Sequence, residues 1–310
     1  MRFSKWLIKI LGYLLYTLAV LAFMLWFQFP VVAVKTRLES ELRGLTPDLQ
    51  WNIGRISLAL PADILLSDIR VSDKHKLKES LFIIDSLALR PALWAYLQDG
   101  KLSAGYRLGI LDGSVNGRLS LTDDHNGLQY DGNANGIKII GLKKILQDLD
   151  RTVSGTLSGS FTGKGALRGS GEVELEGNIK ILKGEISFRK PVLGMAKLAF
   201  NQVSSRLKYG SEGIRLIDGK IESRLLAGDF TGIVKPVAGI GRSILQLNGA
   251  LVPRPEFLST IGDGAAVNMV KRQLQGGKLP FIISGTLKEP GIVFTGLPTD
   301  FNQPPQGEGK

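Results

Sequence analysis

The chain has 310 residues, of which 44% are hydrophobic and 38 are glycine, and it contains no cysteine. This length allows one large or two modest domains with real cores and argues against a disordered chain. The absence of cysteine excludes disulfides and thiolate metal sites. The formal net charge of +11 would favour nucleic acid as a partner, but aromatic residues make up only 7% and the basic residues are scattered in pairs. We therefore expect an anionic lipid surface, an acidic protein or simple surface solvation as the reason for the charge, and no nucleic acid.

The most apolar segment of the chain is the stretch from Ile10 to Phe29, which carries no formal charge. A helix needs about 20 apolar residues to cross the hydrocarbon core of a bilayer, so residues 10–29 are predicted to form a transmembrane helix. A cleaved signal peptide is the alternative, and Val31-Val32-Ala33 is a weak match to a cleavage site. A signal peptide would have a shorter apolar region, so we favour a retained anchor.

The charges before this stretch predict its orientation. Arg2, Lys5 and Lys9 precede it with no acidic residue among them. By the positive-inside tendency, residues 1–9 are then cytoplasmic and about nine-tenths of the chain lies on the other side of the membrane.

A helical period follows the apolar stretch. Val34, Leu38, Leu42 and Leu45 recur at helical spacing with charged residues on the other faces. We predict a short amphipathic stalk helix within residues 30–47, which Pro30 begins and the following Thr-Pro-Asp ends.

Residues 48–150 read as a first β region. Apolar and polar residues alternate from Trp51 onward, and residues 91–98 could form one or two helical turns. Helical spacing also predicts a helix from Gly141 to Leu149. Repeated hairpins are predicted at four turn-favouring dipeptides, Asp112-Gly113, Asn116-Gly117, Asn126-Gly127 and Asp131-Gly132.

Residues 151–297 read as a second β region with the clearest alternation in the chain. From Val153 to Gly163 the odd positions are apolar or glycine and the even positions carry hydroxyls, and the pattern continues beyond Val173 before a turn predicted at Lys183-Gly184. One apolar face results, which is either the core of a sandwich or an open trough. The candidate lipid- or partner-binding residues on it are Val153, Leu157, Phe161, Val173, Leu175, Ile179 and Ile181.

Three later segments repeat this strand pattern. Residues 226–234, 245–251 and 281–287 alternate in the same way, and a proline follows each one. This is a degenerate repeat of a strand and its exit turn. Short helices are expected at Glu256–Ile261 and Ala265–Leu274, and the tail, residues 298–310, lacks periodicity and is expected to be disordered.

No motif for catalysis, cofactor binding or metal binding stands out. His75 and His125 have no serine, cysteine or second histidine at a useful spacing. Residues 131–136 match the opening of a calcium loop, but Leu142 occupies the twelfth position, where a bidentate glutamate is needed. We expect a protein without enzymatic activity, cofactor or metal.

Several segments together resemble type II secretion system protein N, a family grouped with the AsmA-like proteins. They are the junction FPVVAVKTRLESEL, the strand pair WNIGRISLALPADILLSDIRV and the later SGTLSGSFTGKG, AGDFTGIVKP and SGTLKEP. The resemblance implies a bacterial inner-membrane protein with one span, which faces the periplasm and serves the secretion apparatus. It also implies long, curved, glycine-rich sheets with an apolar concave face.

The expected fold is mainly β. We predict one transmembrane helix, a stalk helix, and a long, mostly antiparallel, repetitive sheet, either curved or a sandwich, with a few short helices. Two functions remain open. The domain either contacts other type II secretion components, for example by strand addition at a sheet edge, or binds phospholipid acyl chains along its apolar face.

Overall fold

A computed structural model of the full chain provides the coordinates. The residues that it describes are 12–14, 16, 17, 20, 24, 30–46, 49–59, 63–74, 80–122, 126–142, 146, 149, 152–166, 173–193, 195–237, 240–260 and 277–295.

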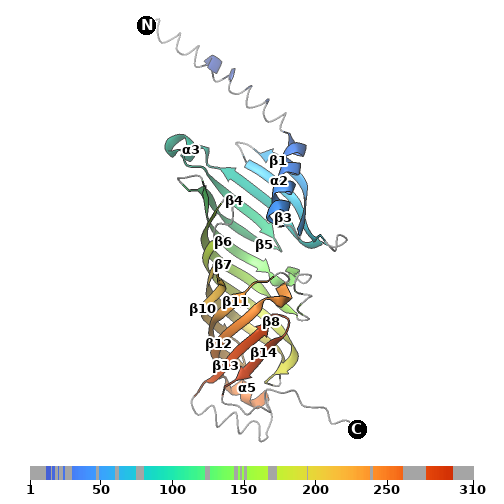
Figure 1. Ribbon diagram of the computed structural model, residues 1–310, viewed down its shortest axis with the longest axis vertical. Helices are drawn as coiled ribbons and strands as arrows, with labels where there is room; N and C mark the ends of the chain where they lie inside the picture. Colours follow the sequence, from blue (N-terminus) through green and yellow to red (C-terminus); the bar gives the residue numbers. More distant parts are fainter. Residues whose placement is uncertain are drawn as a thin grey trace.

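The described residues fold into one antiparallel sheet in which every strand pairs with the strands before and after it in the sequence (Figure 1). Its fourteen strands are β1 (Leu49–Ala59), β2 (Asp63–Asp73), β3 (Ser80–Pro91), β4 (Ser103–Ile110), β5 (Gly113–Leu121), β6 (Gly127–Lys138), β7 (Val153–Ala166), β8 (Glu174–Val192), β9 (Met195–Gly210), β10 (Gly213–Glu222), β11 (Leu226–Lys235), β12 (Ile244–Pro253), β13 (Leu279–Thr286) and β14 (Pro290–Phe294). The prediction of a mainly β, antiparallel fold is confirmed. The sheet continues from β6 to β7, so it crosses the boundary drawn at residue 150.

The helices within the described residues are short. They are α2 (Val31–Leu45), α3 (Leu93–Asp99), α5 (Pro255–Thr260) and the 3-10 turns η1 (Ile139–Leu142) and η3 (Ile240–Arg242). Helices were predicted at the positions of α2, α3 and α5. The predicted helix at residues 141–149 falls largely outside the described residues, and the one at residues 265–274 falls entirely outside them.

The predicted transmembrane stretch and the predicted tail also lie mainly or wholly outside the described residues. Within the part of the chain that the structure describes, no helix combines the length and apolar character that a membrane crossing requires.

Two of the four predicted turns are wrong. Asp112-Gly113 does join β4 to β5, and Asn126-Gly127 lies where β6 begins. Asn116-Gly117 and Asp131-Gly132 instead lie inside β5 and β6, where the two glycines face each other across the strands. Neither position has room for a side chain, because a Cβ on Gly117 would meet the Asp131 carbonyl oxygen and one on Gly132 would meet the side chains of Tyr106 and Phe161.

The predicted turn at Lys183-Gly184 is wrong as well. β8 runs through this point without reversing, and Lys183 has a φ of 50°. The pairing of β7 with β8 shifts by one residue here, which is a β-bulge. A bulge keeps the strand going, reverses which residues face inward and increases the local twist.

Among the described residues, buried clusters pack at the two ends of the sheet. At the N-terminal end, Val34 and Leu38 of α2 pack on a buried cluster around Ile53, Ile69 and Ile84. At the C-terminal end the sheet curls back on itself (Figure 1). There a second cluster, built from β13 and β14, contacts the turn between β8 and β9. In the helix α5, Phe257 is also buried and is 1% exposed.

Candidate functional site: the apolar face of the sheet

One unbroken row of apolar residues and glycines crosses all fourteen strands. Each member is the direct register partner of the next, so all of them lie on the same face of the sheet. We call it the central row: Leu58, Ile64, Leu89, Tyr106, Gly117, Gly132, Phe161, Gly177, Leu207, Leu216, Gly232, Leu247, Ile283 and Ile292.

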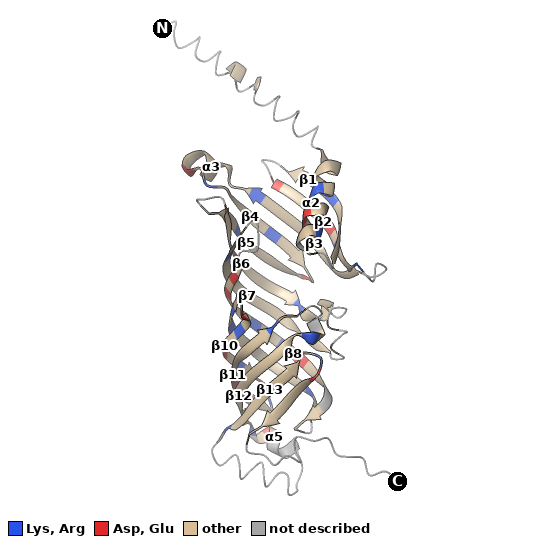
Figure 2. Cartoon of the chain, in the orientation of Figure 1, with Lys and Arg blue, Asp and Glu red and all other residues tan. Residues whose placement is uncertain are grey.

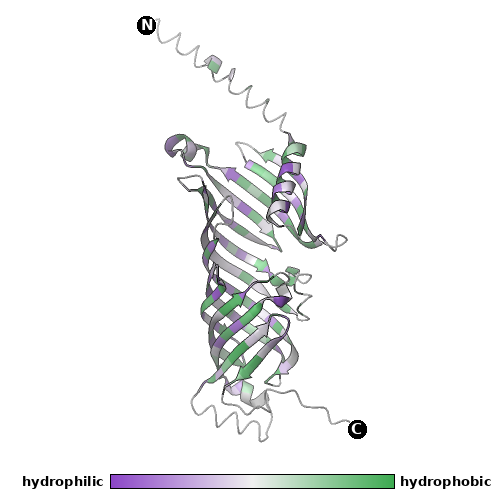
Figure 3. Cartoon of the chain, viewed as in Figure 1, coloured by the Kyte–Doolittle hydropathy of each residue, from purple (hydrophilic) through white to green (hydrophobic). Residues whose placement is uncertain are grey.

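Two further rows flank the central row on the same face. The first runs from β3 to β14 through Pro91, Ala104, Leu119, Tyr130, Gly163, Leu175, Tyr209, Ile214, Val234, Leu245, Gly285 and Pro290. The second runs from β1 to β8 through Ile56, Leu66, Leu87, Leu108, Val115, Ala134, Gly159 and Ile179. We call the three rows together the apolar face. None of their members is charged, and their alternation with polar residues is visible along the strands in Figure 3.

Aromatic rings and glycines alternate across this face. A Cβ atom on Gly132 would lie 2.3 Å from the hydroxyl oxygen of Tyr106 and 2.6 Å from Cζ of Phe161. A Cβ atom on Gly163 would lie 2.5 Å from Cζ of Tyr130. The rings therefore lie flat over bare backbone, which stabilises the strand pair and keeps the face thin.

The hydroxyl groups of the two tyrosines in this region each donate a hydrogen bond to a backbone carbonyl oxygen. Tyr106 donates to the carbonyl oxygen of Asp131 at 3.0 Å, and Tyr130 donates to that of Glu174 at 3.3 Å. Burial raises the pKa of both tyrosines above the usual value of 10.0. Both hydroxyls therefore stay neutral at physiological pH and add no charge to the face.

Among the described residues, the middle of the central row is neither covered nor fully exposed, whereas Ile64 at one end and Ile283 and Ile292 at the other pack against the two buried clusters. All of its non-glycine side chains are half-buried, from Leu58 in β1 to Ile292 in β14. A sandwich would bury such a row against a second sheet, whereas all described strands belong to a single sheet.

Five of the seven predicted candidate residues lie on this side of the sheet, three of them on the apolar face itself. Phe161, Leu175 and Ile179 belong to the three rows defined above. Leu157 and Ile181 pair with each other in the next row along β7 and β8. That row continues through Val203, Ile221, Gly228, Leu251 and Leu279.

The two remaining candidates lie at the margins. Val153 starts β7 and pairs with Ile186 beyond the bulge. Val173 precedes β8 and is 44% exposed, next to Gly165. The structure thus joins five of the seven candidates in one patch and leaves these two at its border.

The sequence analysis missed how far the face extends. Leu247 and Ile283 continue the central row, although their strands were recognised only as echoes of the β7 pattern, and the strand of Leu207 was not among the predicted repeats. The signal was present, because each echo keeps the same alternation of apolar residues and glycine with polar residues. What was lacking was the register, which decides whether separate strands share a face.

The opposite face of the sheet is polar and carries cross-strand ion pairs. Charges of both signs are spread over the strands in Figure 2. Register partners of opposite charge pair at 3.2 Å between Lys164 and Glu174 and at 2.6 Å between Lys208 and Glu176. These groups are exposed, so each pair adds little stability. They mark this face as the solvated one.

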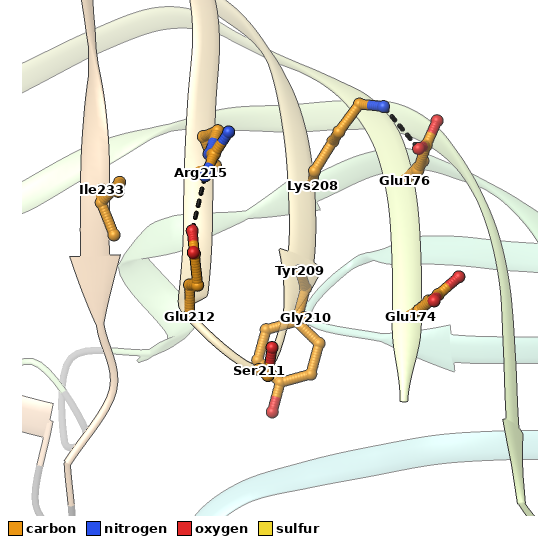
Figure 4. Close-up of a pocket in the computed structure, with 10 residues that line it drawn as sticks. Glu174, Glu176, Lys208, Tyr209, Gly210, Ser211, Glu212, Arg215 and Ile233 are labelled. Carbon is orange, nitrogen blue, oxygen red and sulfur yellow. Dashed lines mark hydrogen bonds and ion pairs between the residues drawn. The ribbon is translucent and has the colours of Figure 1, made fainter. Parts of the chain in front are cut away.

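A shallow polar pocket of about 360 Å³ lies beside the turn between β9 and β10 (Figure 4). Its three carboxylates all have cationic partners. Glu212 pairs with Arg215 at 2.5 Å, and Glu174 and Glu176 have the lysine partners described above. Paired carboxylates on the rim of a sheet offer no general base or nucleophile, so we place no chemistry here.

One carboxylate on the sheet has its pKa lowered by a neighbouring arginine. Asp63, at the start of β2, is 8% exposed and accepts bidentate hydrogen bonds of 2.6 to 3.1 Å from Arg90 of β3. These hydrogen bonds lower the pKa of Asp63 despite its burial. The pair joins the ends of two strands, which fits a structural role.

The calcium-like segment is not a loop. Residues 131–136 form the middle of β6, so Asp131, Asn133 and Asn135 point to the same side of an extended strand. A calcium loop needs these side chains to converge on one point. Among the described residues no group of three or more histidine, cysteine, aspartate or glutamate side chains could hold a metal ion. His75 and His125 lie outside the described residues.

No family model, curated protein or solved structure matches the chain. The fold and the site by themselves define a protein with one long, curled antiparallel sheet, a polar face with cross-strand ion pairs and an apolar face that spans every strand.

Proposed function

We propose that the chain is a membrane-anchored, non-catalytic protein that binds phospholipid acyl chains along its apolar face. One observation carries the proposal: the central row consists of apolar residues and glycines across all fourteen described strands, and its non-glycine side chains are only half-buried. Apolar patches of this extent on one protein are typical of sites that bind apolar partners. The resemblance to AsmA-like proteins, with an inner-membrane anchor and a periplasmic sheet, belongs to the same proposal.

The shape of the face suits an acyl chain better than a compact ligand. Its rings lie over glycines, so the floor of the face is smooth. A flexible hydrocarbon chain can lie along such a floor, and each methylene removed from water contributes about 0.8 kcal/mol. The polar opposite face of the sheet, with its ion pairs, then remains in water.

A photocrosslinker placed on alternate residues of β7 tests this function. The full chain is made in cells with p-benzoylphenylalanine in place of Phe161, on the apolar face, or in place of Thr162, its exposed neighbour on the polar face. After irradiation, we expect mass spectrometry to find phospholipid adducts at position 161 and not at position 162. Absence of lipid adducts at 161, or equal yields at both positions, contradicts the proposal.

A second candidate function is an accessory role in the type II secretion apparatus. The observation that favours it is the position of β14, which is the last strand of an open sheet. The backbone of a terminal strand can pair with a strand from another protein. The same crosslinker in place of Val293, which is 45% exposed on β14, should then capture secretion components. Capture of lipid alone at this position would argue against strand addition.

A further inference from the structure

The helix α3 turns its large apolar side chains away from the protein. Leu93, Trp94, Tyr96 and Leu97 are 53%, 77%, 52% and 72% exposed, and no residue of the helix is buried. Ala95, on the opposite side, is half-buried. At 100° per residue the four large side chains occupy one continuous face of about 160°. A helix in a water-exposed position would normally have the reverse arrangement.

The position of this helix is fixed by backbone hydrogen bonds. The Ala92 amide, just before α3, donates to the Ser103 carbonyl oxygen at 2.8 Å, and the Gly100 amide, just after it, donates to the Tyr96 carbonyl oxygen at 3.0 Å. Gly100 closes the helix in the left-handed conformation with a φ of 68°. The exposed apolar side chains are therefore presented by an ordered element between the ends of β3 and β4.

α3 lies at the end of the molecule where the chain enters the sheet. In Figure 1 it sits at the same end as the beginning of α2. Only Pro30 separates α2 from the uncharged stretch Ile10–Phe29, which is predicted to span a bilayer. A membrane that holds this stretch must therefore have its surface near Val31, at the end of the sheet that carries α3.

We propose that α3 inserts the side chains of Leu93, Trp94, Tyr96 and Leu97 into the bilayer surface and forms a second membrane contact beside the anchor. Tryptophan and tyrosine are the residues that favour the interface between hydrocarbon and water, because their rings are apolar and carry one polar group. Leucine on the same face adds apolar area. With two contacts, the sheet has a fixed orientation on the membrane, and its N-terminal end lies against the lipid. This inference rests on the membrane anchor of the proposed function, but it does not depend on lipid binding by the apolar face.

The absence of cysteine from the sequence allows a direct test. Leu97→Cys in the full chain is labelled with the fluorophore NBD, and the protein is reconstituted in vesicles of phosphatidylethanolamine and phosphatidylglycerol. The matched control is Ser211→Cys, an exposed position in the turn between β9 and β10 at the same ends of the strands as α3. The two sites are separated by about six strand spacings, or about 29 Å along the sheet.

We expect the label at position 97 to emit at shorter wavelength and to lose at least half of its emission when brominated lipids replace the ordinary ones. The label at position 211 should report water and show no quenching. A label at 97 that is shielded from water but unquenched by brominated lipid would indicate a protein partner or a second copy, and would overturn the proposal. So would a water-exposed label, or a chain that does not float with the vesicles. Lipid adducts at position 161 are scored separately, so either hypothesis can fail without the other.

Discussion

A carboxylate in the row of Leu157, which adjoins the apolar face on the same side of the sheet, should weaken lipid binding while leaving the fold intact. Leu157 is half-buried and pairs with Ile137 and Ile181, both apolar, so Leu157→Asp puts a charge within the trough. Without lipid the carboxylate keeps contact with water. Against acyl chains it costs about 2.5 to 3.5 kcal/mol by the scale for aspartate in a bilayer. Since about 1.4 kcal/mol is tenfold in affinity, binding should weaken about 60- to 300-fold.

The assay measures lipid adducts as a function of lipid concentration. Full-length protein with p-benzoylphenylalanine in place of Phe161 is titrated in detergent with phospholipid and irradiated at each point. Ser160→Asp is the control, because Ser160 is exposed on the polar face of the same strand and pairs with two asparagines. Half-saturation should shift for Leu157→Asp and stay within about twofold for Ser160→Asp. Equal curves for the two variants, with unchanged circular dichroism, would refute the assignment of the face.

Three further predictions concern stability. Gly132→Ala forces two covering rings aside, since its Cβ would lie 2.3 Å from a tyrosine oxygen. Overpacking of about 1 to 3 kcal/mol should lower the unfolding temperature by about 2 to 12 °C. Gly105→Ala, whose nearest atoms are 3.9 Å away, should not lower it, and equal effects of the two substitutions would contradict the packing. Arg90 lowers the pKa of Asp63, so the stability that this carboxylate contributes is present above its unfolded pKa of about 4 and is lost as the pH falls through the folded value. In urea titrations the difference between the wild type and Asp63→Asn should shrink between about pH 6 and pH 3, and a constant difference would exclude this linkage. Leu38→Ala removes a contact of α2 with the N-terminal cluster. Relative to the wild type, deuterium exchange should therefore speed up more at the amides of β1 than at those of β7. Unchanged exchange in β1 would show that α2 does not protect the sheet.

Local patterns predicted the strands well, because alternation with a period of two is a property of a single segment. Residues 153–163 and the three later segments all form strands at the expected places. The helix at Val31–Leu45 followed in the same way from its helical period. The burial of Val34 and Leu38 in the N-terminal cluster required knowledge of their partners across the chain.

Errors arose where a short-range signal competed with a long-range contact. Asn-Gly at 116–117 and Asp-Gly at 131–132 are favourable hairpin turns by themselves. Both glycines are instead extended, because Tyr106 lies over them from β4. A sequence shows the glycine and the tyrosine, but only the register brings them together. Register also determines the candidate site, since a shift by one residue would turn a whole strand's apolar side chains to the polar face.

The way the two ends of the apolar face are covered limits how lipid could reach it. At the N-terminal end Ile53 and Val71 are fully buried, and at the C-terminal end Leu279 is fully buried and Phe257 nearly so. Displacing such contacts to admit an acyl chain would cost about 1.5 to 3 kcal/mol per side chain. Side chains in the middle, such as Phe161, are half-buried in the absence of any ligand, so a chain laid on them removes water-exposed surface without breaking the core. Under the proposed function, acyl chains therefore enter from the open side between the two clusters, and α2 and α5 act as fixed ends of the trough.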